Sequence, residues 1–126
     1  MANLSLLAAA TLTVGVGLVH SWLGEVRLIW PLVAPGKRMG ILEKSAFARG
    51  VLRFAWHLTT VAWWGFAAVL VVLAQTQVTG QDRIVLIAIA VMFAMTGLIA
   101  LIASRGRHLA WPVFLAIAGL AIVPLW

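Results

Sequence analysis

The sequence contains no cysteine and few charged residues. The absence of cysteine excludes disulfide bonds, thiolate metal ligands and cysteine nucleophiles. Only 10% of the 126 residues are charged and only 3 are acidic, whereas a soluble domain carries about 25% charged residues. The hydrophobic share is 64%, and the mean hydropathy is +1.11. This composition indicates a membrane protein.

Four long apolar runs are present in the chain. A helix needs about 18 to 25 apolar residues to cross a hydrocarbon layer about 30 Å thick. Hydrophobicity that is continuous rather than alternating favours helices over a closed barrel of strands. The sequence therefore predicts an all-α, integral membrane four-helix bundle that forms one transmembrane domain over residues 1–126. The predicted helices cover residues 4–24, 50–74, 84–103 and 109–126.

The positive charges are unevenly distributed between the predicted connections. The formal net charge is +6. The first and third connections hold most of the basic residues, namely Arg27, Lys37, Arg38, Lys44, Arg49, Arg105 and Arg107. The second connection balances Asp82 against Arg83. Because basic residues favour the cytoplasmic side, this pattern predicts that connections one and three are cytoplasmic and that both termini lie outside. Nucleic-acid binding is not expected, since the chain has no aromatic and basic surface domain.

The first predicted helix carries a seam of small residues that leads toward a carboxylate. The seam recurs every four positions and consists of Ala9, Thr13, Gly17 and Ser21. This spacing puts small side chains on one face, where another backbone can approach closely. Glu25 is next in the series. The connection over residues 25–49 is amphiphilic, with an expected turn at Pro35 and Gly36, and we expect it to lie along the inner leaflet surface.

The second predicted helix carries a polar stripe made of Arg49, Arg53, His57, Thr60 and Trp64. At about 100° per residue these side chains fall within an arc of roughly 80°. Polar groups at membrane depth turn toward the bundle or a water-filled cavity, because lipid cannot satisfy them. We therefore expect Glu25 to neutralise Arg53 or Arg49, and His20 to lie near His57.

Several functions remain compatible with these residues. If Glu25, Arg53 and Arg49 form a structural charge clamp, the chain is a non-catalytic bundle that self-associates or serves as an accessory subunit of a membrane assembly. Alternatively, His20 and His57 bind haem b or a metal ion. A small dimeric transporter or proton-coupled channel is a further alternative. Catalysis on a lipid would use His57 or Glu25 as general base, but no nucleophile with a base and an orienting partner is recognisable in the sequence.

The sequence "HSWLGE" at residues 20–25, followed by "LRFAWHLTT" at residues 52–60, resembles a type of small four-helix protein of the bacterial inner membrane. The resemblance covers mainly the first two predicted helices. It implies a multi-pass protein of the inner membrane, in contact with the lipid bilayer. It implies no activity.

Overall fold

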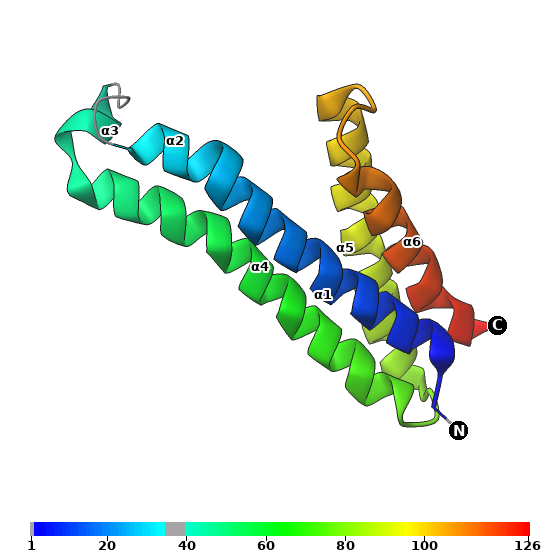
Figure 1. Ribbon diagram of the computed structural model, residues 1–126. Helices are drawn as coiled ribbons and strands as arrows, with labels where there is room; N and C mark the ends of the chain where they lie inside the picture. The colour runs from blue at the N-terminus through cyan, green and yellow to red at the C-terminus, as the bar shows by residue number, and fades with distance from the viewer. Residues whose placement is uncertain (1, 35–39) are drawn as a thin grey trace. The chain divides into compact units, whose positions relative to one another are not determined.

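The computed structural model describes residues 2–34 and 40–126, and the described chain is helical. The expected turn at Pro35 and Gly36 and the charges of Lys37 and Arg38 lie outside the described residues. The elements are α1 (Leu4–Gly24), the π-helical turn η1 (Glu25–Ile29), α2 (Trp30–Val33), α3 (Ile41–Lys44), α4 (Ala46–Ala74), α5 (Gly80–Ser104), α6 (Ala110–Ile122) and the 3-10 turn η2 (Val123–Leu125) (Figure 1).

The predicted all-α class is confirmed. Among the described residues, three helical segments are long and apolar enough to cross a membrane, namely Leu4–Val33, Ala46–Ala74 and Gly80–Ser104. The chain is therefore a helical membrane protein with three candidate spans. A fourth apolar segment, Ala110–Leu125, is shorter.

The helical boundaries around the first connection differ from the predicted ones. α1 ends at Gly24 as predicted, but the helical backbone continues through η1 and α2 to Val33. The next long helix begins at Ala46 rather than at residue 50. Burial explains the extension, because Ile29 and Val33 are both buried. The prediction ended the first helix where charged residues begin, and charge does not stop a helix whose apolar side chains still pack.

The fourth helix is shorter than the predicted span over residues 109–126. α6 and η2 together extend from Ala110 to Leu125, which is about 25 Å at 1.5 Å per residue and less than the ~30 Å of a hydrocarbon layer. The helical segment starts one residue later and ends one residue earlier than predicted. In the turn that precedes it, Arg105 and Gly106 have positive φ angles of 52° and 78°. These residues end α5, and the helix does not resume before Ala110.

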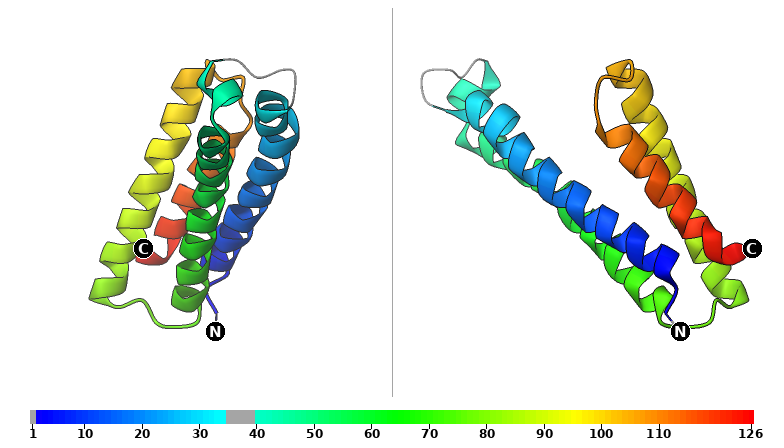
Figure 2. Two further views of the ribbon diagram at one scale, coloured as in Figure 1. Left: turned by 90° about the vertical axis from the view of Figure 1, so that its left-hand side faces the viewer. Right: turned by 45° about the vertical axis from the view of Figure 1, so that its right-hand side comes forward.

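The chain divides into two compact units. The first unit comprises Met1–Val16 and Trp64–Trp126. Within it, α5 and α6 lie side by side and run in opposite directions (Figure 1 and Figure 2). Its core centres on Phe93, which is fully buried. The ring of Phe93 lies 6.2 Å from that of Phe66 and 6.0 Å from that of Phe114.

The second unit, Gly17–Trp63, joins the end of α1 and the turn η1 to the first half of α4. Gly17 is buried, and its carbonyl oxygen accepts a 3.4 Å hydrogen bond from the Thr60 hydroxyl. The indole N–H of Trp56 donates to the His20 carbonyl oxygen at 3.2 Å. The small residue Gly17 of the seam therefore serves a contact between helices of the same chain.

The helical segments that contain Gly24 and Trp56 approach each other closely at Gly24. A Cβ atom added at Gly24 would collide with the Trp56 indole ring. We expect Gly24→Ala to lower the free energy of unfolding by about 1–3 kcal/mol, because the ring has to move. Thermal unfolding followed by circular dichroism in detergent measures the effect.

Gly15→Ala is the matched control for this substitution, because a Cβ there would meet nothing within 4 Å. Alanine inside a helix is favoured over glycine by about 0.5–1 kcal/mol, so this variant should be neutral or stabilised. Equal melting temperatures for the two variants would contradict the close approach at Gly24.

Candidate functional site

Five polar side chains of the second unit form one hydrogen-bonded chain, which we call the polar network: Arg53, Glu25, His57, Ser21 and Thr60. Arg53 Nη2 lies 2.8 Å from Glu25 Oε1, and Arg53 Nε donates to Glu25 Oε2 at 3.3 Å. His57 Nε2 is 3.2 Å from the same Oε2 atom, and His57 Nδ1 is 2.9 Å from Ser21 Oγ. The Ser21 and Thr60 hydroxyl oxygens are 2.8 Å apart.

Helical periodicity places the members of the network on one face of each of two helical segments. Arg53, His57 and Thr60 follow one another on α4 at spacings of four and three residues, and Ser21 and Glu25 are four residues apart across the end of α1 and the start of η1. Residues three or four apart lie on one face of a helix. The network is therefore an interface between two helical faces.

Arg53 and Glu25 form the charged end of the network. Two guanidinium nitrogens approach the two carboxylate oxygens. Such a two-point contact fixes the relative orientation of the two groups in addition to pairing their charges. The Arg53 side chain is 42% exposed and that of Glu25 is 30% exposed. Since Thr60 at the other end is buried, the network runs from a half-exposed ion pair to a buried hydroxyl.

Both ring nitrogens of His57 have partners within the network. A carboxylate only accepts hydrogen bonds, so His57 Nε2 must carry the proton that is donated to Glu25. In the neutral ring, Nδ1 then accepts from the Ser21 hydroxyl. The single proton of the Thr60 hydroxyl is then shared between Ser21 Oγ at 2.8 Å and the Gly17 carbonyl oxygen at 3.4 Å. His57 thereby links the ion pair to the hydroxyl pair.

His20 lies in a different group of side chains. Its ring stacks on Trp56, with centroids 4.3 Å apart and an angle of 8° between the planes, and it meets the Trp63 ring edge-on at 4.9 Å. His20 Nε2 is 3.0 Å from the Thr59 hydroxyl oxygen. None of Trp56, Trp63 and Thr59 belongs to the polar network. Within residues 2–34 and 40–126, no group of three or more His, Cys, Asp or Glu side chains is arranged to hold a metal ion.

Arg49 is engaged elsewhere. Its Nη1 atom donates to the carbonyl oxygen of Leu42 at 2.8 Å and to that of Glu43 at 3.4 Å. Arg49 therefore joins the start of α4 to α3, whereas Arg53 meets the Glu25 carboxylate. The sequence allowed either arginine to pair with Glu25, because both lie on the same helical face.

Ser21, His57 and Glu25 stand in the order of a nucleophile, a base and an orienting carboxylate, which the sequence did not reveal. The pairing of Ser21 with His57 depends on how the two helices are rotated, and no sequence spacing reports that. However, Ser21 lies inside α1, where backbone N–H groups bond within the helix. These groups are not free to stabilise an oxyanion, which acyl transfer requires. The arrangement favours a structural link over catalysis.

Comparisons with known proteins add no assignment to this geometry. No family model matches the chain, and neither a curated protein nor a solved structure shows significant similarity to it. The resemblance noted for the first two predicted helices remains a prediction.

The energetic role of the Arg53 and Glu25 pair can be measured with a double-mutant cycle. We expect Glu25→Gln and Arg53→Gln each to destabilise the protein, because each leaves a partly buried charge without its partner. The double variant should lose less than the sum, with a coupling of about 0.5–3 kcal/mol. Unfolding in detergent, followed by helical circular dichroism, gives the four free energies.

Glu43→Gln with Arg49→Gln provides a matched cycle on the same stretch of chain. Arg49 bonds backbone carbonyl oxygens, so the effects of these two substitutions should add. Additivity in the Glu25 and Arg53 cycle as well would show that the ion pair does not hold the helices together.

Proposed function

We propose that the protein is a small multi-pass subunit of the bacterial inner membrane, a non-catalytic helical bundle that self-associates or serves as an accessory subunit of a larger membrane assembly. The observation that carries the proposal is the polar network. The Glu25 carboxylate contacts both Arg53 and His57 across the two helical faces. The ionisable side chains of the network are therefore used to hold helices in register.

The network suits a structural charge clamp. A charge at membrane depth is costly unless it is paired, and here one carboxylate is shared between a guanidinium and an imidazole. The hydroxyl groups of Ser21 and Thr60 extend the link to the Gly17 backbone. Interhelical hydrogen bonds of this kind contribute about 0.6 kcal/mol each on average in membrane proteins, so several acting together are needed.

The same contacts weigh against the alternatives. A haem or metal ligand role for His57 requires that a ring nitrogen release either Ser21 or Glu25. Proton relay requires a chain of groups that accept and release protons, whereas this chain reaches a backbone carbonyl oxygen at Gly17. A carbonyl oxygen has no proton to pass on. Both roles therefore have less support than the clamp.

Exposed apolar side chains supply the surface for lipid and for partner helices. Large examples in the second unit are Trp22 and Phe54, which are 67% and 66% exposed. In the first unit, Ile99 and Ile102 are 63% and 74% exposed. Apolar surface of this extent is not left in water, and it suits contact with acyl chains or with other membrane subunits.

The charge distribution supports a four-span topology with both termini outside. This topology requires that α6, although short, crosses the bilayer, which local thinning of the bilayer would allow. Reporter fusions after Lys44 and after Arg107 should report the cytoplasm, and fusions after Thr79 and after Trp126 should report the outer side. The fusion after Trp126 decides the role of α6. A cytoplasmic signal there, with the other three as expected, would show that α6 does not cross.

The subunit proposal is tested by the native mass and the visible spectrum of the same detergent-purified sample. We expect particles that contain more than one 13.5 kDa chain, or this chain together with other membrane subunits, and no Soret band. A monomer with a Soret band that disappears in His57→Asn would contradict the proposal and support haem ligation.

A further inference from the structure

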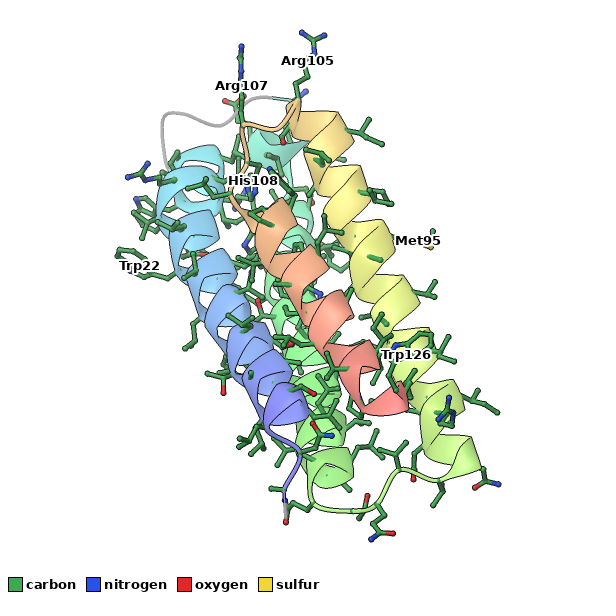
Figure 3. The ribbon with its side chains drawn as sticks, turned by 90° about the vertical axis from the view of Figure 1, so that its right-hand side faces the viewer. Trp22, Met95, Arg105, Arg107, His108 and Trp126 are labelled. Carbon is green, nitrogen blue, oxygen red and sulfur yellow. The ribbon has the colours of Figure 1, made fainter. Side chains whose placement is uncertain are left out.

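The turn between α5 and α6 presents three exposed basic side chains, which we call the basic turn: Arg105, Arg107 and His108. In Figure 3 the side chains of Arg105 and Arg107 point away from the two helices. The one acidic residue in the sequence of the first unit is Asp82, and it lies in the first turn of α5. That position is about 35 Å from Arg105 along the helix axis. The first unit therefore has no carboxylate of its own beside the basic turn.

The backbone of the turn is closed by its own hydrogen bonds. The N–H of Gly106 donates to Leu101 O at 2.9 Å, and the N–H of Arg107 donates to Ser104 O at 3.1 Å. His108 N–H donates to the Ser104 hydroxyl oxygen at 3.2 Å. The turn is held by these bonds, and the two guanidinium groups extend from it.

His108 adds a donor of defined position. The N–H of Ala110 donates to His108 Nδ1 at 3.2 Å, so the neutral ring carries its proton on Nε2. The indole N–H of Trp111 donates to Gly106 O at 3.3 Å and ties the start of α6 to the turn. Tryptophan is typical of the membrane interface.

The length of α5 places this turn at the depth of lipid phosphates. The 25 residues of Gly80–Ser104 extend about 37 Å at 1.5 Å per residue. This length exceeds the ~30 Å hydrocarbon core and falls short of the 40–45 Å that includes the headgroups. A residue just past the end of such a helix therefore lies among headgroups rather than in bulk water.

We propose that the basic turn binds the phosphate of an anionic phospholipid headgroup. Guanidinium groups match phosphate oxygens in pairs, and Arg105 and Arg107 offer two of them at headgroup depth, with the Nε2–H of His108 as a further donor. A lipid phosphate is favoured over a soluble one because the site lies at the end of a membrane-spanning helix and beside Trp111. This site is independent of the polar network and of any subunit partner.

Lipid binding is tested with the full-length protein by native mass spectrometry in detergent. The protein is titrated with phosphatidylglycerol and, in parallel, with phosphatidylcholine of the same acyl chains. We expect at least about tenfold tighter binding of phosphatidylglycerol, since each basic residue at a membrane surface adds to the attraction of anionic lipid. Inorganic phosphate is added as a competitor and should displace little lipid at millimolar concentration.

Arg105→Gly is the informative variant because Arg105 has a φ of 52°, a conformation that glycine adopts without steric cost. The variant should unfold at the same temperature as the wild type or higher, yet bind phosphatidylglycerol several-fold more weakly. Arg107→Gln, at an exposed position with ordinary φ, should weaken binding similarly. Arg83→Gln at the opposite end of α5, next to Asp82, is the control and should leave binding unchanged.

Three results would overturn the proposal. The first is equal affinity for the two lipids. The second is undiminished phosphatidylglycerol binding in the folded Arg105→Gly and Arg107→Gln variants. The third is displacement of the lipid by millimolar inorganic phosphate, which would identify a soluble anion as the ligand. None of these results depends on the oligomeric state or on the Glu25 and Arg53 coupling, so the subunit proposal stands or falls separately.

Discussion

A charged group between apolar helices needs a polar partner, and in the second unit the Glu25 carboxylate is shared between the Arg53 guanidinium and the His57 ring. The carboxylate meets the Arg53 guanidinium with both oxygens and the His57 ring with one. Because Arg53 and His57 are one helical turn apart on α4, two contacts to a single carboxylate fix both the rotation and the axial position of α4 against η1. Ser21 and Thr60 then fall within hydrogen-bond distance.

Close backbone approach and the polar network depend on each other. Serine and threonine hydroxyl groups are short, so they bridge two helices only where the backbones are near. Gly17 and Gly24 permit that approach, since Thr60 reaches the Gly17 carbonyl oxygen and the Trp56 ring occupies the space where a Gly24 side chain would be. The absence of a side chain at Gly17 and Gly24 is thus the steric condition for the hydrogen bonds.

The long apolar runs of the sequence predicted the helices, and helical periodicity predicted the polar stripe. Neither predicted which members of the stripe meet which partners. Arg49 and Arg53 share a face, and the choice between them depends on axial position. Glu25 lies in the π-helical turn Glu25–Ile29 and meets Arg53, whereas Arg49 bonds carbonyl oxygens of α3. His20 and His57 lie at similar predicted depth, yet their rings have different partners because His20 stacks on Trp56. Successive residues of a helix are about 100° apart around its axis, so a rotation of the helix by that angle would bring different side chains together. Packing between the helices sets this rotation, and the sequence does not report it.

The distribution of acidic residues explains why some basic groups are paired within the chain and others are not. Of the 3 acidic residues, Glu25 is committed to Arg53 and His57, and Asp82 closes a capping box with Thr79 at the start of α5. A carboxylate used in this way is not available to a distant cation. With 9 Lys and Arg against 3 Asp and Glu, most of the positive charge has to be balanced from outside the chain, and at the ends of membrane helices the anions at hand are those of lipid headgroups.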